Sequence, residues 1–98
     1  MGVLYEKVAL VTGGGSGIGR ATAVLMAIEG ARIIVSDVNI EGGAETIAQI
    51  RSAGGEAIFI RADISKAAEV EALVAEAVKT YGRLNIAFNN AGVGGDLS

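Results

Sequence analysis

The sequence predicts an α/β fold with a parallel β-sheet, and three observations support this prediction. Four short apolar runs rich in β-branched residues alternate with three longer segments whose apolar residues recur at helical spacing. A glycine-rich turn lies between the first run and the first helical segment. The 98 residues suffice for one hydrophobic core, so we expect a single domain over residues 1–98.

The first strand and the first helix flank the glycine-rich turn. Residues 8–11 form the apolar run, and Gly30 is the expected C-cap of the helix that follows the turn. The apolar face expected of this helix consists of Ile18, Ala21, Leu25 and Ile28. Residues 33–37 then predict a second strand that ends in a carboxylate, Asp37.

The second helix has a weaker apolar stripe, and two glycines at residues 54–55 end it. Its stripe consists of Ile40, Ala44, Ile47 and Ile50. Residues 57–60 predict the third strand. Ser65 is the expected N-cap of the third helix, which Gly82 closes, and residues 84–88 predict the fourth strand. The third helix has the clearest stripe: Val70, Leu73, Val74, Ala77, Val78 and Tyr81.

Strands separated by helices of this length imply right-handed crossovers and a parallel sheet. We therefore predict a three-layer fold of the Rossmann type, with the strand order 3-2-1-4. In this arrangement a ligand lies over the carboxyl ends of the strands, where the winding reverses. Polar features follow all four strands, so we expect them to meet at that edge.

The glycine-rich turn predicts a cradle for phosphate groups. Its spacing is TGxxxGxG, in which Gly13 permits a tight turn, Gly17 permits close approach of backbone N–H groups to a pyrophosphate, and Gly19 lets the helix pack closely. Ser16 adds a hydroxyl donor. The residues of this segment expected to contact a cofactor are Gly13, Gly15, Ser16, Gly17, Ile18 and Gly19.

Asp37, eighteen residues beyond Gly19, is expected to accept hydrogen bonds from both hydroxyls of an adenosine ribose. Its charge repels a 2′-phosphate, and neither Val38 nor Asn39 offsets that repulsion. The pattern favours NAD over NADP. The simpler interpretation is a helix cap or a solvated turn residue.

Two further segments are candidate cofactor contacts. Asp63 is expected to meet the adenine amino group while Ile64 covers the ring, unless Asp63 only closes a turn. The segment Asn89, Asn90, Ala91 and Gly92 either bonds strand ends together or approaches the ribose beside the nicotinamide. Arg20 reaches phosphate or is a solvated side chain, and Tyr81 is expected in the core.

Composition and charge exclude several classes of function. The net charge is −3 and the eight Lys and Arg residues are scattered singly, so we expect no nucleic-acid partner. The sequence has no Cys and no His, which excludes thiolate chemistry and the usual zinc sites. No apolar run approaches the length of a membrane span, and residues 1–7 lack a signal pattern. We expect a cytoplasmic protein without a membrane partner.

Together these motifs resemble the short-chain dehydrogenase/reductase family over essentially the whole chain. The resembling positions are Thr12, Gly13, Gly17, Ile18, Gly19, Asp37, Asp63 and residues 82–92. Asn85 departs from the pattern, because the family usually has Asp there. The substitution keeps the shape of the side chain but removes its charge. It leaves undecided whether Asn85 makes the contact that would brace the sheet.

The resemblance implies NAD-dependent hydride transfer between nicotinamide and an alcohol or carbonyl substrate, in a tetramer. Members have about 250 residues, in the range of single-domain α/β folds, and use an Asn, a Ser and a Tyr-x-x-x-Lys pair that match nothing up to Ser98. We therefore interpret the chain as the N-terminal, cofactor-binding part, with no catalytic residue and no activity of its own. Its fourth strand is expected to be an open edge, which predicts marginal stability, aggregation or pairing.

A second hypothesis belongs to a different class. The chain is then a non-catalytic NAD-binding module, or half of a split protein that another chain completes. The codons after Ser98 distinguish the two hypotheses, since a Ser followed by Tyr-x-x-x-Lys supports the enzyme and a stop codon supports the module.

Overall fold

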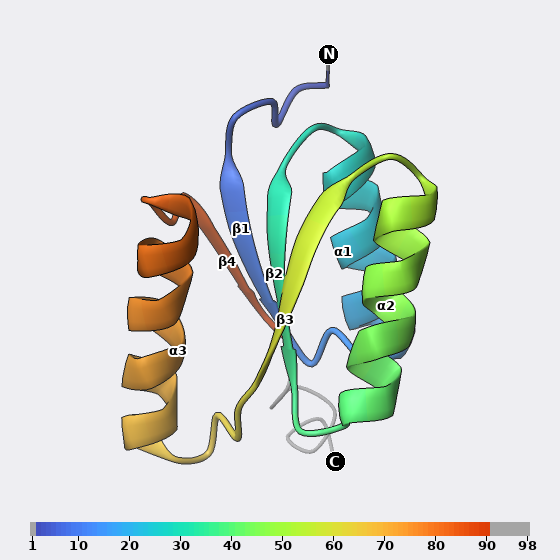
Figure 1. Ribbon diagram of the computed structural model, residues 1–98. Helices are drawn as coiled ribbons and strands as arrows, with labels where there is room; N and C mark the ends of the chain where they lie inside the picture. Colours follow the sequence, from blue (N-terminus) through green and yellow to red (C-terminus); the bar gives the residue numbers. More distant parts are fainter. Residues whose placement is uncertain (1, 91–98) are drawn as a thin grey trace.

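The computed structural model describes residues 2–90, which form a four-stranded parallel sheet between two layers of helices (Figure 1). The elements alternate in the order β1 (Val8–Thr12), α1 (Gly17–Ile28), β2 (Arg32–Asp37), α2 (Ile40–Ser52), β3 (Glu56–Arg61), α3 (Ala67–Tyr81) and β4 (Ile86–Asn89). The strand order is β3-β2-β1-β4, as predicted. Helices α1 and α2 cover one face and α3 covers the other, which confirms the Rossmann-type architecture.

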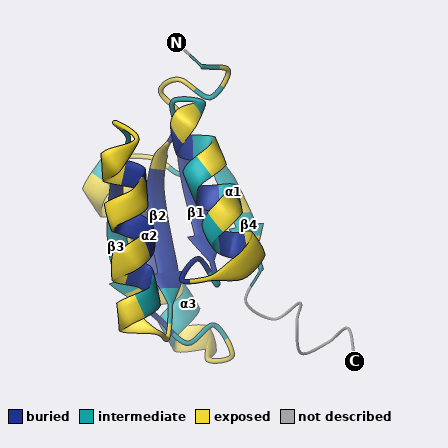
Figure 2. Ribbon diagram, turned by 90° about the vertical axis from the view of Figure 1, so that its right-hand side faces the viewer, coloured by how far each residue is buried: buried dark blue, intermediate teal, exposed yellow. Residues whose placement is uncertain are grey.

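The central strands β1 and β2 separate two hydrophobic cores. All of β1 is buried, as are residues 33–36 of β2, because helices cover both faces (Figure 2). The core on the α1 and α2 side contains Ala9, Val11, Ile33, Val35, Ala23, Ala27, Ile47 and Ile50. The core on the α3 side contains Val8, Leu10, Ile34, Ala62, Leu73 and Ala77. Ile86 and Phe88 of β4 pack against the first core.

The buried face of α1 differs from the predicted one. Its buried residues are Gly19, Ala23 and Ala27. The large residues of the predicted face, Ile18, Leu25 and Ile28, are 58 to 69% exposed. Helix α1 is apolar on two sides, so periodicity alone does not identify the inner one. Small residues spaced by four positions face the sheet because they let the helix backbone approach β1 closely.

The other two helices follow their predicted stripes only in part. In α2, Ile47 and Ile50 are buried as predicted, but Ile40 and Ala44 are exposed. Gly43 and Thr46 take the remaining buried positions of α2. In α3, Leu73 and Ala77 are buried. The α3 stripe also includes Val74 and Val78, which are exposed, and Val70 and Tyr81, which are partly buried.

Helix α3 begins differently from the prediction. Lys66, not Ser65, is the N-cap, and its side chain makes no capping hydrogen bond. The Ser65 hydroxyl donates instead to Oδ1 of Asp63 at 2.7 Å. An N-cap side chain accepts hydrogen bonds from the backbone N–H groups of the first helical turn. The Ser65 hydroxyl acts as a donor to a charged carboxylate, so the serine closes the preceding turn.

Asn85 fastens the start of β4 to the start of β1. Its Oδ1 accepts from the Val8 N–H at 2.9 Å, and its own N–H donates to the Val8 carbonyl at 2.9 Å. The bracing contact left open by the sequence is therefore made without a charge.

Tyr81 packs against the α3-side core, as expected. Its hydroxyl is buried without a hydrogen-bond partner among the described residues, and burial raises the pKa of Tyr81, with the nearby Glu56 carboxylate adding to the effect. In residues 2–90, no helix has the length and apolar character needed to cross a bilayer.

Candidate functional site

The polar features that follow the strands lie at one edge of the sheet. The glycine-rich loop follows β1, Asp37 ends β2, Asp63 follows β3, and Asn90 follows β4. These strands are parallel neighbours, so their carboxyl ends share the lower edge in Figure 1. The structure therefore brings together the described residues that the sequence singled out.

The glycine-rich loop turns sharply between β1 and α1. Gly13 and Gly17 have φ angles of 64° and 55°, in the left-handed region that glycine adopts without strain. The Gly14 N–H donates to the Ser36 carbonyl at 3.0 Å, which ties the loop to β2.

Gly19 allows α1 to lie against the loop. A Cβ at this position would overlap the Gly13 carbonyl oxygen and lie 3.1 Å from Nδ2 of Asn90. The Gly13 oxygen belongs to the backbone and cannot rotate away as a side chain could. The close packing predicted for Gly19 is therefore a contact with the turn itself.

The N-terminus of α1 is open. Ser16 is the N-cap residue, but its side chain makes no capping hydrogen bond, and the first turn contains no acidic residue. Ser16, Gly17 and Ile18 are all exposed. Free N–H groups at the positive end of a helix are a favourable environment for an anion such as a phosphate.

The Asp37 carboxylate is held by two backbone donors. Its Oδ2 accepts from the Gly15 N–H at 2.9 Å, and its Oδ1 accepts from the Asn39 N–H at 3.0 Å. A Cβ at Gly15 would lie 2.8 Å from Oδ2. Each carboxylate oxygen can accept a further hydrogen bond, so Asp37 is fixed in orientation and still able to bind a ligand.

Arg20 and Thr46 hold the far side of the loop. The Arg20 guanidinium donates through Nε to Oγ1 of Thr46 at 2.9 Å, and through one NH₂ group to the carbonyls of Gly15 at 2.6 Å and Gly42 at 3.2 Å. Thr46, which is fully buried, donates to the Gly14 carbonyl at 2.6 Å. The loop is thereby bonded to α1, α2 and β2.

Asn89 and Asn90 bond the ends of β4 and β1 together. The Thr12 hydroxyl donates to Oδ1 of Asn89 at 2.9 Å and accepts from the Asn90 N–H at 3.1 Å. The Asn90 side chain lies 3.5 Å from the Gly13 carbonyl oxygen. Of the two interpretations left open, the contacts support strand-end bonding. Ala91 and Gly92 lie outside the described residues.

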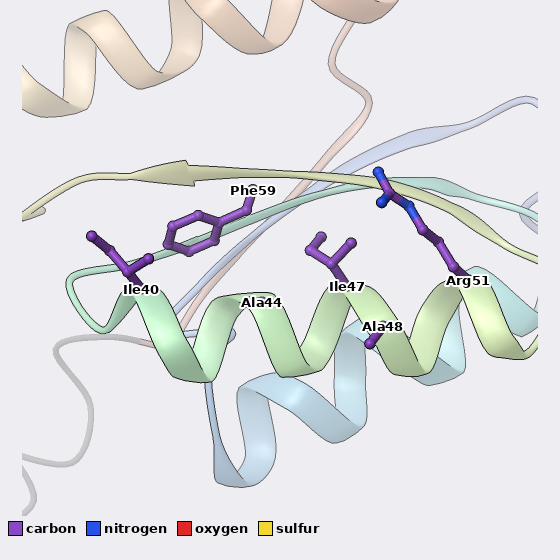
Figure 3. A pocket seen from close by; sticks show the side chains of 6 residues that line it. All are labelled: Ile40, Ala44, Ile47, Ala48, Arg51 and Phe59. Atoms are coloured by element: carbon purple, nitrogen blue, oxygen red, sulfur yellow. The ribbon is translucent and has the colours of Figure 1, made fainter.

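A groove between α2 and β3 is separate from this edge. It has a volume of about 360 Å³ and is lined by Ile40, Ala44, Ile47, Ala48, Arg51 and Phe59 (Figure 3). The Phe59 ring fills the space where a Cβ at Gly43 would lie. None of the described residues in the predicted site lines this groove.

Comparison with known proteins gives the family. The family model described as short chain dehydrogenase matches residues 7–98. The chain belongs to the short-chain dehydrogenase family. It is 44% identical to cyclohexanol dehydrogenase of Acinetobacter sp. (strain SE19) over 93 residues, which cover 95% of this chain and 37% of the relative. It is 49% identical to an uncharacterised oxidoreductase of Thermotoga maritima, over 89% of this chain and 34% of the relative.

Solved structures also share the fold. A crystal structure of NAD⁺-bound xylitol dehydrogenase matches with a TM-score of 0.89 at 38% identity, and the match covers 92% of this chain and 35% of that one. The chain thus spans about a third of the length of these relatives.

In this chain, the sequence leaves the role of Arg20 undecided and gives little indication of the role of Thr46. The only sequence signal for Thr46 is a polar residue within one helical turn of Ile47 and Ile50. A buried hydroxyl on an apolar helix face needs a hydrogen-bond partner, and the partner is the loop carbonyl of Gly14.

Asp63 closes a turn. Its Oδ1 accepts from the Ser65 hydroxyl at 2.7 Å and from the Ser65 N–H at 3.0 Å, while the Asp63 N–H donates to Oε1 of Glu69 at 2.8 Å. The hydrogen bonds from Ser65 lower the pKa of Asp63 below its ordinary value of 3.8, and Lys66 contributes. Among the described residues, Oδ2 of Asp63 has no hydrogen-bond partner in the protein. These contacts support the turn interpretation for Oδ1 and leave the adenine contact a prediction. Ile64 is partly exposed beside it.

Replacing Ser65 by alanine is expected to raise the pKa of Asp63 toward 3.8, because the hydroxyl is the main stabiliser of the carboxylate. A depressed carboxyl pKa stabilises the fold above pH 3.8, and this contribution is lost as the pH falls through the folded pKa. The Ser65→Ala protein should lose that extra stability and so show a smaller loss on acidification. NMR titration of the Asp63 carboxyl carbon measures the shift. An unchanged pKa would show that the Ser65 N–H alone is sufficient.

Proposed function

We propose that this chain binds NAD and belongs to a dehydrogenase that exchanges hydride between the nicotinamide and an alcohol or carbonyl substrate. The observation that carries the proposal is the fixed Asp37 carboxylate beside the glycine-rich loop. Oxygens with free lone pairs at the end of β2 suit a ribose diol and oppose a 2′-phosphate.

The residues fit the pyrophosphate and the adenosine ribose of a dinucleotide. The open N-terminus of α1 suits the pyrophosphate, with Ser16 as an additional donor. Arg20, the cation nearest the loop in sequence, already donates to the loop carbonyl of Gly15 and to Thr46. Because the Arg20 guanidinium is already bonded to these acceptors, it is not free to bind a 2′-phosphate, and this supports the preference for NAD.

Further cofactor contacts are proposed at the same edge. They involve Gly13, Gly15, Gly17, Ile18, Gly19, Asp63, Ile64, Asn90, Ala91 and Gly92. The NAD⁺-bound xylitol dehydrogenase supports the choice of cofactor, since its fold matches this chain with a TM-score of 0.89. Nicotinamide, when bound, supplies the hydride acceptor or donor. The residues of this chain bind and orient it.

Calorimetric titration of the purified protein with NAD and NADP tests the proposal. We expect NAD to bind about 100-fold more tightly, since repulsion of the 2′-phosphate and loss of a charged hydrogen bond each cost on the order of 1.5 kcal/mol. Equal affinities, or tighter binding of NADP, would contradict it. The 98-residue chain by itself is expected to oxidise no alcohol in a nicotinamide absorbance assay.

Tetramer formation and a cytoplasmic location follow from the family resemblance and from the composition, and they stay predictions.

A further inference from the structure

A continuous hydrogen-bond relay connects α1 to the Asp37 carboxylate. It begins at Nε of Arg20, which donates to Oγ1 of Thr46 at 2.9 Å, and Thr46 donates to the Gly14 carbonyl at 2.6 Å. The peptide unit that contains this carbonyl also contains the Gly15 N–H. That N–H donates to Oδ2 of Asp37 at 2.9 Å. One peptide plane is therefore held from both sides.

The direction of the relay is fixed by chemistry. A guanidinium only donates, so the Thr46 oxygen must accept from Arg20 and use its single proton elsewhere. Two carbonyls are within reach, at 2.6 Å for Gly14 and 3.2 Å for Gly42, and the shorter contact is the stronger. Proton donation to the Gly14 carbonyl polarises the peptide and strengthens its N–H as a donor to Asp37.

The relay also restricts a flexible segment. A peptide between two glycines is free to rotate to other backbone conformations, because neither residue has a Cβ. Thr46 is fully buried, and Arg20 holds the next carbonyl, that of Gly15, at 2.6 Å. Rotation of the Gly14–Gly15 peptide would break the bond to Asp37 and leave the Thr46 hydroxyl with only the longer contact to the Gly42 carbonyl, at 3.2 Å.

We propose that Thr46 and Arg20 are positioning residues for Asp37 and thereby set the preference for a free ribose diol over a 2′-phosphorylated one. Neither residue needs to touch the cofactor. They act through the Gly14–Gly15 peptide, which orients the carboxylate. This inference rests on the proposed function, since it assigns the selectivity of that same site.

The test compares the ratio of the NADP and NAD dissociation constants in matched variants of the full chain. Thr46→Val removes the hydroxyl at nearly constant volume and should lower the ratio about three- to tenfold, the effect of one lost hydrogen bond. Thr46→Ser keeps the hydroxyl and should restore the ratio to within about twofold of the original. In the Asp37→Ala background, Thr46→Val should leave the ratio unchanged.

A purely structural role for Thr46 predicts equal weakening of both cofactors and an unchanged ratio, which would overturn the inference. An equal effect in the Asp37→Ala background would overturn it as well. Should Thr46→Val fail to fold, Arg20→Lys decides, since it keeps the charge but loses the planar fork and should lower the ratio in the same direction. If the unmodified protein shows no preference for NAD, the proposed function fails. If that preference holds and Thr46 has no effect on it, the relay alone fails.

Discussion

The Asp37→Ala protein is expected to lose its preference for NAD, with the ratio of the NADP and NAD dissociation constants falling by about 100-fold. Two effects add. The ribose hydroxyls lose a charged acceptor, which weakens NAD, and the 2′-phosphate loses a repelling charge, which strengthens NADP. In addition, the N–H groups of Gly15 and Asn39 donate to Asp37 in the unmodified protein, and in the variant they become free to donate to that phosphate.

Calorimetry with both cofactors measures this ratio, and Asp63→Ala is the matched control. Both variants remove one carboxylate at the carboxyl edge of the sheet, but the proposed partner of Asp63 is adenine, which NAD and NADP share. Asp63→Ala should therefore change both affinities in parallel and leave the ratio intact. A ratio that is the same in Asp37→Ala as in the unmodified protein would remove Asp37 from the site.

The architecture was predictable because its signals are local and repeated. Continuous apolar runs such as residues 8–11 identify strands buried on both faces, and a glycine ends each helix where the chain turns back. The position of Asp37 at the end of β2 follows from the same pattern, since parallel strands direct their carboxyl ends to one edge. Strand bounds were correct to within about two residues.

Contacts between elements were not predictable in the same way. The inner face of α1 depends on how closely the helix approaches β1, and the small residues Ala23 and Ala27 permit a distance that hydrophobicity alone does not encode. The bond from Thr46 to Gly14 joins residues 32 positions apart, so no local pattern contains it. Ser65 lies one residue before the N-cap of α3, and its hydroxyl donates to the Asp63 carboxylate, a contact that the capping pattern does not indicate.

The second large effect is expected at Gly19. A Cβ there would overlap the Gly13 carbonyl oxygen, so in Gly19→Ala either α1 moves away from β1 or the turn opens. Overpacking of this kind costs about 1–3 kcal/mol. The same movement displaces the N–H groups at the start of α1, so we expect NAD affinity to fall at least about 10-fold together with the free energy of unfolding.

Gly54→Ala is the control that separates the loss of NAD affinity from the loss of stability. Gly54 has a φ of 88° with open space around the position of a Cβ, so alanine there is strained by its backbone angle alone, at about 1–2 kcal/mol, and no steric clash is added. Gly54 lies beyond the end of α2, at the opposite end of that helix from Asp37 and the loop. Denaturant titration should therefore show destabilisation in both variants, whereas calorimetry should show weakened NAD binding only in Gly19→Ala. Equal loss of NAD binding in the two variants would mean that global stability, and not the contact between α1 and the turn, controls the site.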